Sequence, residues 1–305
     1  MPQFSEEQFA PANGIELCYQ EMGDRDGEPL LLVMGLATQM IAWADEFCEM
    51  LAERGFRVVR FDNRDIGRST RIKAAGVPGK LDMVLGRRAS APYLLRDMAA
   101  DTFGLMDHLG IDSAHLVGAS MGGMIVQAAA IEQPRRVRSI TSIMSTTGSR
   151  RVGHPSYRTF GLLLGKPPRE REAAIERVVK TFKTIGSPGF PFEEERIREI
   201  AGRSFDRGHS EAGIARQLHA ITASGDRTGA LRKLSVPALV IHGSDDVLVN
   251  PSGGRATAKA IPNSRLKIVD GMGHDLPRAL WPEFVEEIAA NAARAPEANP
   301  AAQAA

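Results

Sequence analysis

The stretch AHLVGASMGGMIVQAAAI, residues 114–131, decides the fold class of this chain. It opens with a short apolar run that is typical of a buried strand, and its second half has the composition of a buried helix. Between the two lies GASMG, a G-x-S-x-G pattern centred on Ser120. The pattern alone is weak, since 30 glycines in 305 residues produce it by chance about once in six such chains. Its place between a strand and a helix is the setting of a nucleophile elbow, in which a strained turn exposes a serine hydroxyl at a sheet edge.

A glycine-rich turn of this kind has two other interpretations. It can serve close packing alone, or it can bind phosphate at the N-terminus of the following helix. The phosphate interpretation requires G-x-G-x-x-G or a Walker lysine, and the turn has neither. We therefore predict that Ser120 is a nucleophile, with close packing alone as the open alternative.

A serine nucleophile needs a base, and that base needs a carboxylate to orient it. Behind a nucleophile elbow, the acid and then the histidine follow the serine along the chain. Asp246 lies just after the apolar run 238–241, and His274 follows the run 266–269 in a loop that contains two glycines. Both partners come in the expected order, each just past a predicted strand. The sequence therefore predicts a catalytic triad of Ser120, Asp246 and His274.

Short apolar runs alternate with helical patterns on both sides of the elbow. The predicted strands are 30–34, 56–61, 114–117, 139–144, 238–241 and 266–269, and the predicted helices are 43–54, 91–109, 121–131, 254–260 and 281–290. This alternation predicts an α/β fold with a mostly parallel central sheet that helices cover on both faces. Such sheets bind ligands outside the carboxyl ends of their strands, where the three triad residues stand.

One long stretch interrupts this alternation. Residues 146–235 offer no convincing strand and contain helical segments rich in Arg and Glu, so we predict an inserted helical cap. Residues 1–145 and 236–294 then form the α/β core. The tail, residues 295–305, consists mostly of Ala and Pro and is predicted to be disordered.

The composition narrows the class of protein. The chain is 43% hydrophobic and 25% charged, which is ordinary for a globular protein, and 38 basic residues nearly balance 37 acidic ones. This balance suggests neither a nucleic-acid partner nor an anionic membrane. No signal peptide is recognisable, and the longest apolar run, 30–37, is too short to cross a bilayer, so we expect a cytoplasmic protein.

Neither a metal nor a cofactor is expected. His242 with Asp245 and Asp246 could imitate a metal cluster, but no His-x-x-x-His or cysteine-rich spacing accompanies them. The two cysteines, Cys18 and Cys48, do not make a disulfide framework.

These motifs resemble the α/β-hydrolase superfamily over nearly the whole chain, the tail excepted. Within it the chain is similar to the aclacinomycin methylesterase-like proteins. The matching segments are LLVMG (31–35), WADEF (43–47), RFDNRDIGRS (60–69) and GMGH (271–274). The resemblance implies a cap after the sixth strand and a Gly-x-x-Asp spacing that selects Asp246 rather than Asp245 as the acid. It also implies an oxyanion hole made by the backbone N–H groups of Leu36 and Met121. One departure is Met34 where many relatives carry His, which a hole built from backbone amides should tolerate.

The resemblance further implies a serine-dependent carboxylic ester hydrolase that works through an acyl-enzyme and needs no cofactor. The expected partner is a small-molecule ester or lactone, either a bulky polyketide-type ester or macrolactone (macrolide or anthracycline-like) or a generic ester. The alternatives are a lactonase, a C–C bond hydrolase of the same fold, and a non-catalytic ligand-binding protein, which would usually lose a triad member. We expect neither a nucleic-acid partner nor a membrane partner. A homo-oligomer is left open. The loop 62–69 is expected to be structural, with Asp62 and Arg64 tying it to the cap base or to neighbours of the elbow.

Overall fold

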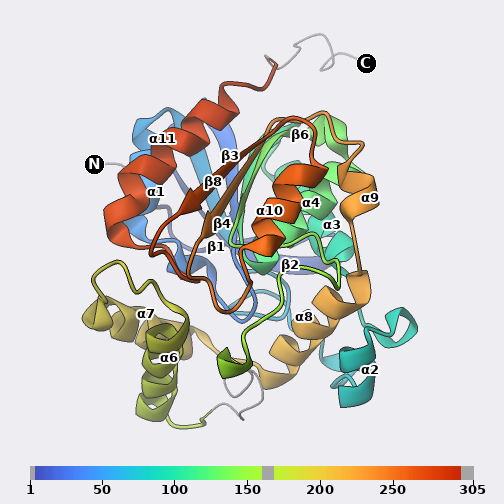
Figure 1. Cartoon of the computed structure of the whole chain (residues 1–305), viewed down its shortest axis with the longest axis vertical. Coiled ribbons are helices and arrows are strands. Elements are labelled where there is room, and N and C mark those ends of the chain that lie inside the picture. Colours follow the sequence, from blue (N-terminus) through green and yellow to red (C-terminus); the bar gives the residue numbers. More distant parts are fainter. Residues whose placement is uncertain (1–3, 160–167, 297–305) are drawn as a thin grey trace.

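Eight strands form a single sheet in the computed structural model, which describes residues 4–159 and 168–296 (Figure 1). The strands are β1 (Gln8–Ala12), β2 (Ile15–Met22), β3 (Glu28–Val33), β4 (Phe56–Phe61), β5 (Ala114–Ala119), β6 (Val137–Ile143), β7 (Ala238–Gly243) and β8 (Ser264–Val269). Their order in the sheet is β1-β2-β4-β3-β5-β6-β7-β8. Strands β3 to β8 pair in parallel, whereas β2 runs antiparallel to both β1 and β4. The mostly parallel α/β sheet predicted from the sequence is confirmed.

The N-terminal hairpin of β1 and β2 is an element that the sequence analysis missed. Asn13 and Gly14 form its two-residue turn, both with positive φ (50° and 77°), which is the Asn-Gly signature of a tight hairpin. Strand β2 buries three consecutive residues, 17–19, instead of alternate ones. Its alternation of apolar and polar residues is therefore weak, although the Asn-Gly pair was a usable signal.

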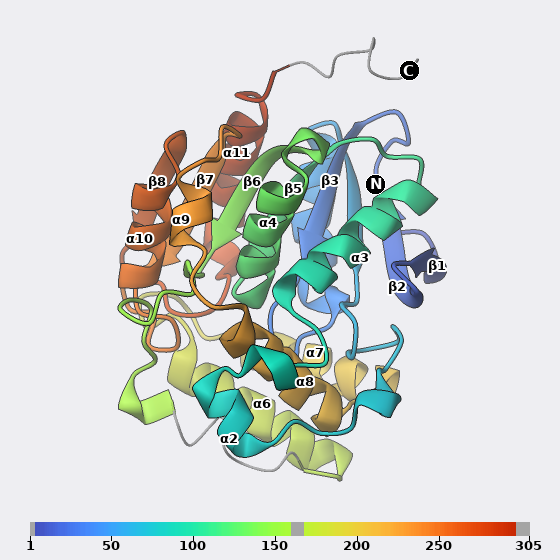
Figure 2. The same ribbon diagram turned by 90° about the vertical axis from the view of Figure 1, so that its right-hand side faces the viewer.

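Helices cover both faces of the sheet, as Figures 1 and 2 show. Helices α1 (Asp45–Glu53) and α11 (Trp281–Ala292) pack on one face, and α3 (Leu95–His108), α4 (Met121–Glu132) and α10 (Ser252–Ala260) lie on the other. Strand β3 supplies both cores, since Leu30 and Leu32 face the α1 side while Leu31 and Val33 face the α3 side. All four side chains are fully buried. Burial on both faces explains why β3 reads as a continuous apolar run.

Between β6 and β7 the chain leaves the sheet. The described part of this stretch holds α6 (Arg171–Ile185), α7 (Glu194–Arg207), α8 (Glu211–Ser224) and α9 (Thr228–Leu231). We call these four the inserted helices. In Figure 1, α6, α7 and α8 lie together at one end of the sheet. Residues 160–167 of the predicted cap, and residues 297–305 of the predicted disordered tail, lie outside the described residues.

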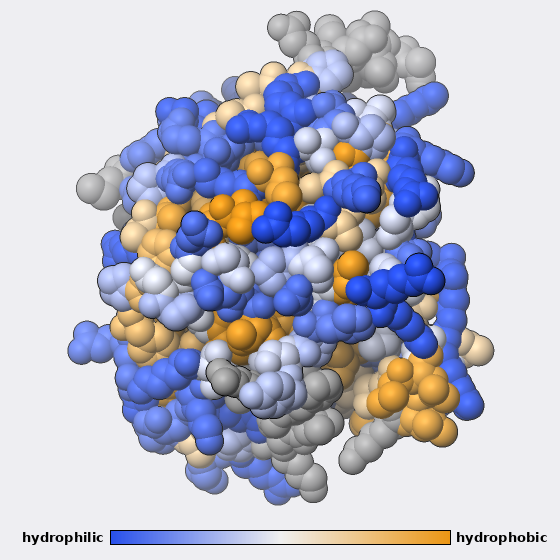
Figure 3. Space-filling model, in the orientation of Figure 1, coloured by the Kyte–Doolittle hydropathy of each residue, from blue (hydrophilic) through white to orange (hydrophobic). Residues whose placement is uncertain are grey.

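A short helix, α2 (Lys80–Leu85), packs beside α8 and carries apolar side chains on the surface. Leu81 is 63% exposed and Val84 78% exposed, and Figure 3 shows an apolar area over this helix at the lower right. Within the described ranges, no helix has the length and apolar character needed to cross a bilayer.

Candidate active site

Three side chains far apart in the sequence meet at the carboxyl ends of three strands. Ser120 follows β5, Asp246 follows β7 and His274 follows β8. Nε2 of His274 lies 3.0 Å from Oγ of Ser120, and Nδ1 of the same ring lies 2.7 Å from Oδ2 of Asp246. The structure therefore brings together the three residues that the sequence selected, with the imidazole between the hydroxyl and the carboxylate.

The backbone of Ser120 is strained. Its φ of 54° and ψ of −116° lie outside the regions that a non-glycine residue prefers, a conformation that costs on the order of 1–3 kcal/mol. The Ser120 N–H donates to the carbonyl of Ile143 at 2.9 Å, and the Ser120 carbonyl accepts from Oγ of Ser145 at 2.8 Å. These two bonds to the end of β6 and the residues after it hold the serine at the tip of the turn between β5 and α4.

Two glycines flanking Ser120 permit this turn. A Cβ added at Gly118 would lie 2.2 Å from the carbonyl oxygen of Gly122, and one added at Gly122 would lie 2.0 Å from the carbonyl oxygen of Val33. Both distances are far below any possible contact. The turn, the start of α4 and the end of β3 therefore approach one another too closely for side chains.

Asp246 is held by several donors. Its Oδ1 accepts the N–H groups of Leu248 at 2.9 Å and Val249 at 2.8 Å, while Oδ2 faces His274. Burial acts to raise the pKa of this carboxyl, but His274, His242 and the Val249 N–H outweigh it and lower that pKa to about 2. Asp246 is therefore ionised at neutral pH.

The neighbouring carboxylate and histidine have different partners. Asp245 is exposed and accepts from Oγ of Ser244 and the N–H of Gly271. His242 is fully buried, donates from Nε2 to the carbonyl of Val249 at 2.7 Å, and lies 3.3 Å from Oδ2 of Asp246. The sequence analysis weighed His242 only as a metal ligand and missed its contact with the acid. Its spacing of four residues from Asp246 was the one available signal.

The loop that carries His274 is bonded to the connection between α6 and α7. The His274 N–H donates to the carbonyl of Ile185 at 2.7 Å, and the Gly189 N–H donates to the carbonyl of Gly271 at 2.9 Å. Oγ of Ser187 accepts the Gly273 N–H at 2.8 Å and itself donates to the carboxylate of Asp275. The end of α6 and the residues after it thus contact the backbone from Gly271 to His274 and the side chain of Asp275.

The two predicted oxyanion donors belong to two segments that lie next to Ser120. Met121 is the first residue of α4, so its N–H has no acceptor within the helix. The Leu36 N–H has no acceptor among residues 4–159 and 168–296. A Cβ added at Gly35 would lie only 3.7 Å from Oγ of Ser120, so the loop after β3 passes directly beside the hydroxyl. The joint role of the two N–H groups in binding an oxyanion stays a prediction.

Two charged side chains anchor the loop 62–69 to neighbouring segments. Asp62 accepts the Met40 N–H and pairs with Arg207 at the end of α7, which agrees with a tie toward the inserted helices. Arg64 instead pairs with Asp101 of α3, one of the helices that pack on the sheet. The side chains of Asp62 and Arg64 thus anchor the loop in two different directions.

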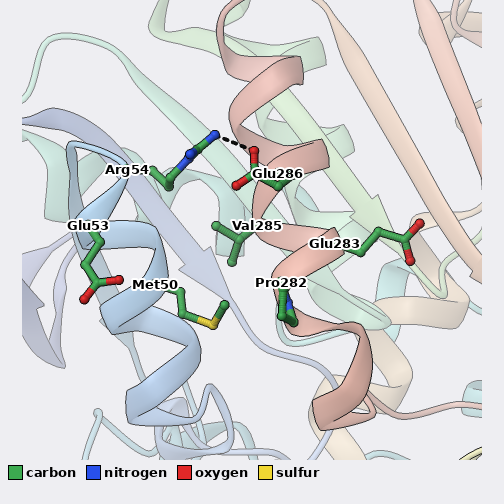
Figure 4. Close-up of a pocket in the computed structure, with 7 residues that line it drawn as sticks. All are labelled: Met50, Glu53, Arg54, Pro282, Glu283, Val285 and Glu286. Carbon is green, nitrogen blue, oxygen red and sulfur yellow. Dashed lines mark hydrogen bonds and ion pairs between the residues drawn. The ribbon is translucent and has the colours of Figure 1, made fainter.

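A separate cavity of about 420 Å³ lies between α1 and α11. Figure 4 shows its lining, which includes Met50, Val285 and the ion pair of Arg54 with Glu286. None of the three converging residues contributes to it. The candidate site is therefore defined by the convergence at the sheet edge and not by this cavity.

Comparison with known proteins identifies the family of the chain. Residues 28–184 match the family model described as the alpha/beta hydrolase fold. Two rhodomycin D methylesterases, DauP of Streptomyces sp. strain C5 and DnrP of Streptomyces peucetius, are 28% identical over 298 residues, covering 91% of this chain and 95% of each relative. The resemblance to methylesterases predicted from the sequence is confirmed.

Two further proteins share the architecture. The 3-oxoadipate enol-lactonase 2 of Acinetobacter baylyi is 25% identical over 271 residues, covering 88% of this chain and 91% of that protein. The crystal structure of the enol-lactonase from Burkholderia xenovorans LB400 superposes with a TM-score of 0.72 at 24% identity, covering 94% of this chain and all of that one. The structural likeness concerns the fold.

Proposed function

The chain belongs to the α/β-hydrolase family and is a hydrolase, and from this premise we propose that it cleaves carboxylic esters through an acyl-enzyme on Ser120. The observation that carries the proposal is the position of the His274 ring, whose Nε2 lies 3.0 Å from the Ser120 hydroxyl while Nδ1 lies 2.7 Å from Asp246. A histidine oriented by a carboxylate is the arrangement that makes a serine hydroxyl nucleophilic.

Acylation begins when Oγ of Ser120 attacks the ester carbonyl carbon and Nε2 of His274 takes the hydroxyl proton. The Nδ1–H of His274 donates to the Asp246 carboxylate, which fixes the tautomer and stabilises the imidazolium. The tetrahedral intermediate collapses as the C–O bond to the leaving group breaks and His274 gives its proton to the departing alkoxide. Water then attacks the acyl-enzyme with His274 again as base, which releases the acid and restores Ser120.

The negative charge that develops on the carbonyl oxygen needs donors that are already in place. We assign this role to the backbone N–H groups of Leu36 and Met121. Losing one donor of this kind typically costs about 10²–10³-fold in turnover. A hole made from backbone amides is also compatible with Met34, since no side chain is required.

The proposed substrate is a methyl ester or another ester of a bulky polyketide-type acid, or a macrolactone. The support is the likeness to two proteins named rhodomycin D methylesterases. Lactone hydrolysis is the second candidate, since a relative named 3-oxoadipate enol-lactonase 2 aligns over most of the chain. We also propose that residues 146–235 act as a cap over a core of residues 1–145 and 236–294. The bonds from the α6–α7 connection to the His274 loop support a cap that lies over the site.

Covalent labelling with a fluorophosphonate tests the proposal, because the reagent phosphonylates an activated serine. The expected adduct maps to Ser120 and is absent in Ser120→Ala. If the folded protein takes up no label, a ligand-binding protein without catalysis is the better account. A panel of methyl esters, lactones and C–C bond substrates, with kcat/KM measured for each, then separates the candidate substrates.

A further inference from the structure

The loop that carries the proposed oxyanion donor Leu36 contains a strained residue and few hydrogen bonds of its own. Ala37, the next residue, has a φ of 60°, in the left-handed region that alanine rarely adopts. The contacts within the loop are a 3.4 Å bond from the Thr38 N–H to the carbonyl of Gly35 and a bond from Oγ1 of Thr38 to the carbonyl of Leu36. A strained residue of this kind persists only where its surroundings hold it.

One buried glutamine holds this loop from outside. The Ala37 N–H donates to Oε1 of Gln217 at 3.1 Å, and Nε2 of Gln217 donates to the carbonyl of Arg64 at 2.8 Å. Gln217 lies on α8 and is fully buried. Its amide group therefore links one inserted helix to two core loops, the loop after β3 and the loop after β4.

The position of α8 is fixed at the neighbouring residue. The guanidinium of Arg216 contacts both carboxylate oxygens of Asp65, at 2.6 Å and 2.8 Å, and both side chains are buried. A Cβ added at Gly213 would lie 2.2 Å from the carbonyl oxygen of Asp65. Helix α8 therefore approaches the loop 62–69 so closely at this position that only glycine fits. A bidentate pair and a close contact leave the Gln217 amide little freedom.

We propose that Gln217 is a positioning residue for the oxyanion hole. By binding the Ala37 N–H, it fixes the peptide next to the Leu36 N–H and aims that donor at the oxygen of the tetrahedral intermediate. This inference rests on the proposed function. It implies that the inserted helices do more than cover the site: the core completes its oxyanion hole only while α8 is seated against it.

The test compares Gln217→Met with Gln39→Met in the full chain. Both substitutions remove a buried amide that links the core to the inserted helices, since Nε2 of Gln39 donates to the carbonyls of Ser204 at 2.7 Å and Gly208 at 3.0 Å. Only the Gln217 amide bonds the Ala37 backbone. We expect kcat for p-nitrophenyl acetate to fall about 10²-fold in Gln217→Met with KM close to the parental value, because a small misplacement of a catalytic group has an effect of that size.

A second readout addresses the transition state directly. Phenylboronic acid adds to an active serine to give a tetrahedral anion that resembles the intermediate. Its inhibition constant should therefore rise in Gln217→Met by about the factor lost in kcat/KM.

The outcomes separate this inference from the proposed function. If Ser120→Ala abolishes activity while Gln217→Met keeps parental kcat and boronate affinity, the positioning role is wrong and the esterase stands. Equal losses in Gln217→Met and Gln39→Met would likewise overturn it, because the effect would then belong to seating of the inserted helices in general. If Ser120→Ala is as active as the parent, the proposed function itself has failed.

Discussion

The carboxylate of Asp246 lies 2.7 Å from Nδ1 of His274, although 28 residues separate them in the sequence. Two backbone N–H groups donate to the other oxygen of the same carboxylate, so the orientation of Asp246 does not depend on His274 alone. Asp245, its neighbour, is exposed and bonds to Ser244 and Gly271 instead. The pair Asp246–His274 is therefore a fixed unit, and three predictions concern it and the groups around it.

Replacing the acid should remove the control of the histidine tautomer. In Asp246→Asn we expect kcat to fall by about 10⁴-fold, the effect of the same change in a serine protease triad. The matched control, Asp245→Asn, should stay near the parental value because its side chain does not contact His274. Steady-state kinetics with p-nitrophenyl acetate provide the comparison, and the opposite ranking of the two variants would show that the wrong carboxylate was chosen.

Low pH should reduce the unfolding free energy of the protein, because Asp246 then becomes protonated. Its pKa is about 2 in the folded protein against an ordinary value of 3.8, so the folded state prefers the ionised form. The resulting stability, on the order of 2 kcal/mol, is fully present above the ordinary value and is lost as the pH falls through the folded pKa. Urea unfolding between pH 5 and 2 should show the parent losing its advantage over Asp246→Asn as the pH decreases below the ordinary value of 3.8. A difference that stays constant over this range would contradict the depressed pKa.

The contact between Ser187 and the His274 loop should matter for turnover. Ser187→Ala leaves the Gly273 N–H without its acceptor and removes one of the donors to Asp275, at a cost of about 1–3 kcal/mol in unfolding free energy. Because Gly273 precedes His274, we also expect a lower kcat. Ser244→Ala is the control, since that exposed hydroxyl accepts the Gly271 N–H, farther from the histidine. Equal kcat values for the two variants would argue against a link between the α6–α7 connection and the base.

The close approach of β3, the turn and α4 predicts strong intolerance to one methyl group. In Gly122→Ala the new Cβ would lie 2.0 Å from the carbonyl oxygen of Val33, so we expect a loss of about 3 kcal/mol in unfolding free energy. Gly229→Ala in α9 is the matched control, because nothing lies within 4 Å of its added Cβ. That variant should be neutral or gain up to about 1 kcal/mol from helix propensity. Urea denaturation of both variants provides the measurement, and similar stabilities would contradict the packing described for the elbow.

Much of the parallel part of the sheet could be predicted because strands such as β3, β5 and β7 are buried on both faces. Leu30 to Val33 therefore form an unbroken apolar run, which stands out from the helical patterns around it. Ser120, Asp246 and His274 were recognisable for a related reason: each follows a predicted strand, and parallel strands bring their carboxyl ends to one edge. The hairpin of β1 and β2 was missed because β2 buries neighbouring residues and lacks clear alternation.

Other parts of the candidate site leave no mark in the sequence. A single glutamine on a helix of mixed polar and apolar residues has no distinctive pattern, and the importance of Gln217 arises only when α8 packs against the loop after β3. The same holds for Ser187, whose partners lie 86 and 88 residues away. Contacts of this kind depend on how two distant segments dock, which neither spacing nor periodicity encodes.

The most direct test of the central claim is the hydrolysis of p-nitrophenyl acetate by Ser120→Ala. Removing the hydroxyl that lies 3.0 Å from His274 should lower kcat by about 10⁴–10⁶-fold, with an unfolding transition close to that of the parent. A folded Ser120→Ala variant that still hydrolyses the ester at a near-parental rate would contradict the assignment of Ser120 as the nucleophile.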